Sequence, residues 1–174
     1  MGLRPRLKGE WSSFAKLLIG ALMAALVGCG AQRSALPPAA PPQQTSGPTI
    51  ALPDGFVVHA EIAADDATRE QGLMYRDHLP EDRGMIFMFP QVGLYPFWMK
   101  STLIPLDMIW IDEQKKVVHV AHDVPPCRAD PCPSYSPNAN ASYVLELAAG
   151  VAGKHKVVTG SVLRFEGLSN VVVR

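Results

Sequence analysis

The stretch FWMKSTLIPLDMIWID, residues 97–112, constrains the fold more than any other part of the chain. It is mostly apolar, yet it carries an amino group at Lys100 and a carboxyl group at Asp107. Pro105 has no backbone N–H to donate, so the stretch predicts two strands and a connection, with the second strand over 106–111. The polar residues then fall on the connection or on an open strand face.

Short apolar segments on both sides of this stretch predict further strands. Residues 56–62 (FVVHAEI) alternate between apolar and polar side chains, which is typical of a half-buried strand. Residues 85–89 (MIFMF) are apolar throughout, which predicts a strand covered on both faces. Further strands are predicted over 95–99, 117–121, 143–147 and 157–165, with a final edge over 170–174.

Helices are a minor part of the predicted fold. Asp65 or Asp66 can cap a short helix that runs to about Gln71 and stops at Gly72. Residues 148–156 predict one more helical turn. Short strands between turn signals therefore predict a mostly β chain, a compact single-domain β-sandwich or barrel-like sheet with one or two short helices.

The N-terminal residues 1–28 are predicted to be a signal peptide. A basic segment precedes LLIGALMAALVG, an apolar run that suits a signal peptide and is too short to span a bilayer comfortably. Leu26-Val27-Gly28 then leads into Cys29, which resembles a bacterial lipidation site. Lipid on Cys29 would hold the protein at a membrane surface, and the alternative is an ordinary signal peptide that contains a cysteine.

Residues 29–48 are rich in proline and nearly free of large apolar side chains. Such a segment cannot bury enough surface to fold, and its prolines favour an extended chain. We therefore expect a lipid-anchored tether over 29–48 and a folded domain over 49–174. Gly30 after the cysteine resembles Gram-negative lipoproteins of the outer membrane, so the expected location is the bacterial cell envelope, on the periplasmic face of that membrane.

The charge of the chain gives no sign of a nucleic-acid partner. The whole chain has 16 basic and 16 acidic residues, and without residues 1–28 it has 12 and 15, a formal net charge of −3. No basic stripe remains, so we expect no nucleic acid among the partners.

Two further cysteines, Cys127 and Cys132, occur in the proline-rich segment CRADPC. In an oxidising compartment, the default for such a pair is a structural disulfide that closes a tight loop. A redox pair and half of a metal site are the alternatives. Redox motifs are usually the tighter CxxC, and no second CxxC is present to complete a zinc site.

Four ordered blocks of this sequence resemble the domain of unknown function 192 family. They are GLMYRDHLPEDRGMIFMFP, FWMKSTLIPLDMIWID, VPPCRADPCPSY and YVLELAAG, within residues 56–165. The resemblance implies a small, mostly β domain that frequently carries a signal peptide or lipid anchor, and it implies no catalytic residue. Ser101 stands where the family pattern usually has Asn, and Ser161 where a Gly-Asp pair is common.

The candidate binding residues are charged or aromatic side chains embedded among apolar neighbours. Trp98 and Lys100 should share the more open face of their strand, and Asp107 could approach Lys100 across the connection. Arg76 and Glu146 are the other two candidates. An aromatic side chain beside mixed charges is a plausible site for a small ligand or glycan. The alternative is an ion pair that pins the connection, with Trp98 as packing.

Metal binding and catalysis have weaker support. Soft thioethers can select Cu(I), but the methionines here lie among apolar residues, as core methionines do; they are Met74, Met85, Met88, Met99 and Met108. Four histidines, His59, His78, His119 and His122, show no chelating spacing. The chain contains no GxSxG, HExxH, phosphate-loop or dinucleotide motif. We assign no metal, no cofactor and no catalytic residue.

These observations predict a lipid-anchored, non-enzymatic module of the cell envelope that binds a ligand or a protein partner. The first alternative is an envelope hydrolase that uses Lys100, Asp107 or Glu146. The second is a soft-metal protein that binds copper.

Overall fold

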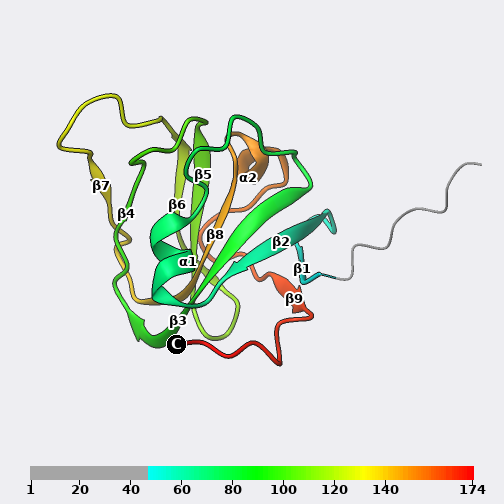
Figure 1. Cartoon of the computed structure of the whole chain (residues 1–174). Coiled ribbons are helices and arrows are strands. Elements are labelled where there is room, and N and C mark those ends of the chain that lie inside the picture. The colour runs from blue at the N-terminus through cyan, green and yellow to red at the C-terminus, as the bar shows by residue number, and fades with distance from the viewer. Residues whose placement is uncertain (1–46) are drawn as a thin grey trace, which may run out of the picture. The chain divides into compact units, whose positions relative to one another are not determined.

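The computed structural model describes residues 47–174, which fold into strands with two short helices (Figure 1). The elements are β1 (Thr49–Ala51), β2 (Val57–Ala63), α1 (Asp66–Gln71), β3 (Arg83–Gly93), β4 (Phe97–Trp98), β5 (Leu106–Ile111), β6 (Val117–Val124), β7 (Ser134–Tyr135), β8 (Ala141–Ala148), α2 (Val151–Lys154) and β9 (Arg164–Glu166).

Most of the described strands belong to one sheet, in the order β6-β5-β8-β3-β2-β1-β9. Neighbouring strands are antiparallel except β2 and β3, which are parallel and are connected through α1. β4 and β7 form a separate antiparallel pair. In Figure 1, α1 lies against one face of the sheet near β3, and β4 and β7 run along the same side.

The central strands bury both of their faces, as the apolar run at 85–89 predicts. All six positions of β5 are buried. Alternation along β5 places Ile109 in one core and Trp110 in the other. We call these the Ile109 core and the Trp110 core. The Ile109 core includes the buried residues of α2, and the Trp110 core includes Leu73, which follows α1.

The sheet curls because the segment before β9 links its two edges. Val117 at the start of β6 donates a hydrogen bond to Ser161 (2.8 Å) and accepts one from Gly160 (2.8 Å). Three residues later the chain enters β9, which pairs with β1. The mostly β, barrel-like prediction with one or two short helices is therefore confirmed.

Three predicted strands differ from the observed ones. The strand predicted over 95–99 is reduced to Phe97–Trp98 and pairs with β7, outside the main sheet. The strand predicted over 157–165 is observed only from its end, as Arg164–Glu166, because Gly160 has a left-handed backbone (φ 96°) and turns the chain. Residues 170–174 form no strand.

Cys127 and Cys132 form a disulfide in the loop between β6 and β7, as predicted. The predicted signal peptide, Cys29 and residues 29–46 of the tether lie outside the described residues. Within 47–174, neither helix is long and apolar enough to cross a membrane.

Candidate functional site

The candidate site is a hollow between α1 and the segment that follows β4. Asp65 caps α1 in a capping box with Thr68, and the helix ends at Gly72, whose φ is 46°. No residue within α1 is buried. The helix therefore packs weakly against the sheet and leaves one side available to line the hollow.

The main hollow has a volume of about 390 Å³. Its walls are Ala67, Glu70, Gln71, Met74 and Tyr75 on the helix side, and Trp98, Lys100 and Ser101 on the other. Trp98 is 49% exposed, and the Lys100 ammonium group lies 5.2 Å from the centre of its ring. Two of the five residues that the sequence singled out, Trp98 and Lys100, therefore line the main hollow.

Two residues of this wall have left-handed backbones, although neither is glycine. Tyr75 has φ 64° and Ser101 has φ 55°, and the Tyr75 N–H donates a 2.8 Å hydrogen bond to the Ser101 carbonyl. Such conformations are costly for residues with a side chain, and they cluster at functional sites.

A second hollow of about 240 Å³ also has Trp98 in its wall. Aromatic side chains line it, and Phe89 stacks on Tyr95 with ring centres 3.5 Å apart. Arg69 of α1 reaches over Phe89 and donates hydrogen bonds to the Met88 carbonyl (2.8 Å) and to Asp66 (2.7 Å). These bonds hold the guanidinium group as a fixed part of the wall.

Glu146 of β8 lines a small slot that shares Glu70 and Trp98 with both hollows. The slot has a volume of about 30 Å³, and Thr102, Met74 and Trp98 are among the residues that also line it. Glu146 is only 4% exposed, and no group among the described residues forms a hydrogen bond or ion pair with it. Burial raises the pKa of Glu146 from 4.5 to about 8, so its carboxyl group is mostly protonated at neutral pH.

Asp107 lies on the opposite face of the sheet from Glu146. The residue that pairs with Asp107 on β8 is Leu147 of the Ile109 core, whereas Glu146 pairs with Met108 of the Trp110 core. The Asp107 carboxyl group accepts hydrogen bonds from the backbone N–H groups of Asp123 (2.9 Å) and Ala152 (2.8 Å). Asp107 therefore anchors the first turn of α2 and does not approach Lys100 in the way that the sequence suggested.

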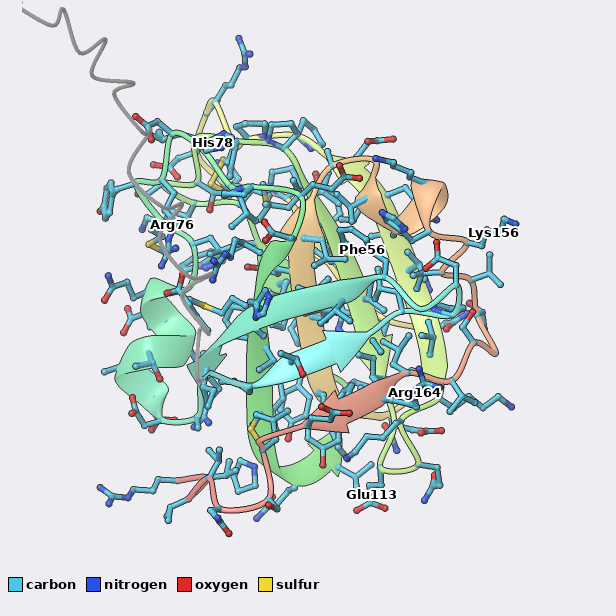
Figure 2. All side chains as sticks on the ribbon, turned by 90° about the vertical axis from the view of Figure 1, so that its right-hand side faces the viewer. Phe56, Arg76, His78, Glu113, Lys156 and Arg164 are labelled. Atoms are coloured by element: carbon cyan, nitrogen blue, oxygen red, sulfur yellow. A yellow bond between two sulfur atoms is a disulfide. The ribbon has the colours of Figure 1, made fainter. Side chains whose placement is uncertain are left out.

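Arg76 is the fifth candidate, and it lies on the loop that follows α1 (Figure 2). It forms a two-pronged ion pair with Glu61 of β2, with N–O distances of 2.5 and 2.7 Å. The Arg76 hydrogen bond lowers the pKa of Glu61. The pair ties the loop to β2, and Arg76 lines neither hollow nor the slot.

Sequence reasoning did not select several residues that line the site. Among them are Glu70, Gln71 and Tyr75. The sequence did contain one indication of the site. Two of the blocks that resemble the family, those with GLMYR and FWMKST, supply residues to both walls of the main hollow.

Four of the methionines that the sequence analysis considered as soft ligands are divided between the two cores. Met85, Met99 and Met108 are buried in the Trp110 core, whereas Met88 belongs to the Ile109 core. Within residues 47–174, no group of three or more His, Cys, Asp or Glu side chains is arranged to hold an ion.

Comparison with known proteins identifies the family of this domain. The sequence profile of the DUF192 family, described as "Uncharacterized ACR", matches residues 49–165. The chain belongs to this family. The matched residues include every wall of the site, so the hollows and the slot are features of the DUF192 domain in this chain. No curated protein matches the chain.

Two solved structures are similar to this DUF192 chain. One is a Sinorhizobium meliloti 1021 protein that was provisionally named a transcription regulator. It is 31% identical, with a TM-score of 0.61, over 68% of this chain and 91% of its own. The other is a protein of unknown function from Novosphingobium aromaticivorans DSM 12444. It is 28% identical, with a TM-score of 0.60, over 67% of this chain and 82% of its own.

Proposed function

We propose that this DUF192 protein is a ligand-binding accessory module of the bacterial cell envelope, anchored by lipid on Cys29, and that its ligand packs on Trp98. The observation that carries the proposal is the position of Trp98, a half-exposed indole that lines both hollows and the slot. Large flat side chains with one face open to solvent are typical of binding sites for small ligands.

The chemistry of the walls favours an uncharged, polar ligand with one flat apolar face. Trp98 supplies the flat surface, and Glu70, Gln71 and Ser101 supply polar groups on both sides of the main hollow. One cation and one carboxyl group, Lys100 and Glu70, line this hollow, so its walls carry no excess of either charge. A nucleic acid would need a basic surface, and the chain outside residues 1–28 has more acidic than basic residues.

The proposed module would bind its ligand without converting it, whereas a hydrolase would release a product. The residues named for hydrolysis do not act together, because Asp107 faces the other core. Glu146 remains at the site, but its slot admits only a water-sized group. Conversion of a bound ligand to product would favour the hydrolase.

The test is ligand-observed saturation-transfer NMR with the full chain in a detergent that has no sugar groups. The panel contains neutral oligosaccharides, short peptides and small aromatic compounds. We expect at least one saturable ligand whose binding falls at least tenfold in Trp98→Ala. The matched control is Val158→Ala, which removes another exposed apolar side chain and should change nothing. Equal binding by the wild type and Trp98→Ala would contradict the proposal.

A further inference from the structure

The carboxyl group of Glu146 is the feature of this site that packing alone does not explain. Its cross-strand neighbours are Met85 on β3 and Met108 on β5, both buried and apolar. Buried polar groups in native proteins are nearly always hydrogen-bonded, and an isolated one costs about 1–3 kcal/mol. A leucine or methionine would fill this position without that cost. Among the fully shielded side-chain atoms of the described residues, only the Ser142 hydroxyl oxygen lacks a partner, so the Glu146 oxygens reach the open space of the slot and take their partner from what fills it.

Among the described residues, the charged groups around Glu146 form no ion pair with it, so burial alone determines whether its carboxyl group is protonated. Arg69 and Glu70 of α1 line the same slot. Arg69 is already bonded to the Met88 carbonyl, Asp66 and the Arg174 carbonyl, and Glu70 is exposed. Lys100, on the segment after β4, lines the adjoining hollow and lies over Trp98. The strands on either side of Glu146 present only methionines at the paired positions.

The missing partner is an acceptor oxygen. A protonated carboxyl group has one O–H to donate, and Thr102, the nearby hydroxyl in the slot, contacts the Lys100 carbonyl at 3.4 Å. The slot holds about 30 Å³, enough for one water-sized group. A carbonyl oxygen fits this description because it is small, uncharged and only accepts.

We propose that Glu146 donates a hydrogen bond to the amide carbonyl oxygen of an N-acylated saccharide whose sugar ring packs on Trp98. This inference rests on the proposed ligand site and names the class of ligand that it takes. Trp98 lines both the slot and the main hollow, so one ligand can cover the indole and point only its carbonyl oxygen into the slot, toward Glu146. The polar residues of the main hollow then face the sugar hydroxyl groups.

The test compares two trisaccharides with the full chain: tri-N-acetylchitotriose and cellotriose, which has the same linkage but no acetamido groups. Calorimetry at pH 6.5 should show at least tenfold tighter binding of the N-acetylated sugar to the wild type. Glu146→Leu should lose that preference, and Glu146→Gln, which still donates through its amide, should keep it within about threefold. Glu113→Gln, which changes an exposed glutamate in the turn between β5 and β6, is the matched control and should keep the preference.

A pH series provides a second arm that does not depend on the folding of Glu146→Leu. Between pH 6.5 and 9.5 the wild type should lose most of its preference for the acetamido sugar, because an ionised carboxylate repels a carbonyl oxygen. Glu146→Gln should show no such loss.

Equal binding of the two sugars, a preference that survives Glu146→Leu, or the absence of binding by either sugar would overturn the inference. Trp98-dependent binding of other panel compounds would then leave the proposed function standing. Loss of all Trp98-dependent binding would end both.

Discussion

Asp107 and Glu146 are two buried carboxyl groups on adjacent strands of one sheet, and they have opposite surroundings. Asp107 is fully buried on the Ile109 core side, where two backbone N–H groups donate to its oxygens. Glu146 is almost as buried on the Trp110 core side, yet nothing in the described part of the chain donates to it. The two side chains are one register position apart across the β5–β8 ladder.

The difference separates a structural role from a role in binding. A buried carboxyl group whose oxygens are satisfied by the backbone holds two segments together, and here it joins β5 to the turn at Asp123 and to the start of α2. A buried carboxyl group with no partner weakens the fold and persists only where something else selects it. Burial of a carboxyl group alone therefore does not identify a binding site. Whether the protein supplies hydrogen-bond partners for its oxygens distinguishes the two roles.

The largest effect is expected from Asp107→Leu. This change removes both acceptors and leaves the N–H groups of Asp123 and Ala152 unsatisfied, so the free energy of unfolding should fall by about 4 kcal/mol. Urea denaturation followed by circular dichroism measures it. Asp112→Leu is the matched control, because Asp112 accepts one exposed backbone bond from Lys116 and should cost less than about 1 kcal/mol. Similar losses in the two variants would break the comparison between the two carboxyl groups.

The sequence predicted the strands well and the partners of these carboxyl groups poorly. Alternation and apolar runs report local burial, so the strands around 56–62, 85–89 and 106–111 were predictable. The face to which Asp107 points depends on the register between β5 and β8, which are separated in the chain by two other strands. The pattern over 143–147 predicted a strand but not its place, and β8 is an interior strand between β3 and β5.

The site was partly predictable for the same reason. Trp98 and Lys100 are close in sequence, so their proximity follows from local structure. The opposite wall comes from α1 and Tyr75, and only the crossover between the parallel strands β2 and β3 places it there. Arg76 was selected for its charge, but its partner Glu61 is on β2.

The second effect is a pH dependence of stability that belongs to Glu146. Its pKa is about 8 in the folded protein and 4.5 as the ordinary value. Between these values the folded state binds more protons than the unfolded state. The free energy of unfolding therefore falls as pH rises, by at most about 1.4 kcal/mol for each pH unit. From pH 5 to 7.5 the wild type should lose roughly 3 kcal/mol relative to Glu146→Gln, which does not titrate.

Chemical denaturation of both proteins at four or five pH values measures this difference, and the subtraction removes the contribution of the other carboxylates. Glu70→Gln should follow the wild type, because Glu70 is exposed in the same slot. A wild type that runs parallel to Glu146→Gln across the window would mean that Glu146 is ionised at neutral pH, and the donor role proposed for it would fail.

The smallest effect concerns Ser142, which sharpens the comparison within one strand. Its side chain shares the face of β8 with Glu146, and its hydroxyl oxygen is buried without a hydrogen-bond partner in the described residues. Unlike Glu146, it lines neither hollow nor the slot. Ser142→Ala should therefore raise the free energy of unfolding by about 1 kcal/mol in urea denaturation and leave ligand binding unchanged. Ser161→Ala should act in the opposite direction, because the Ser161 hydroxyl accepts a 3.1 Å bond from the Val158 N–H. If Ser142→Ala also reduced ligand binding, a side chain outside the slot would affect binding. Contact with the slot would then no longer be a reason to assign a binding role to Glu146.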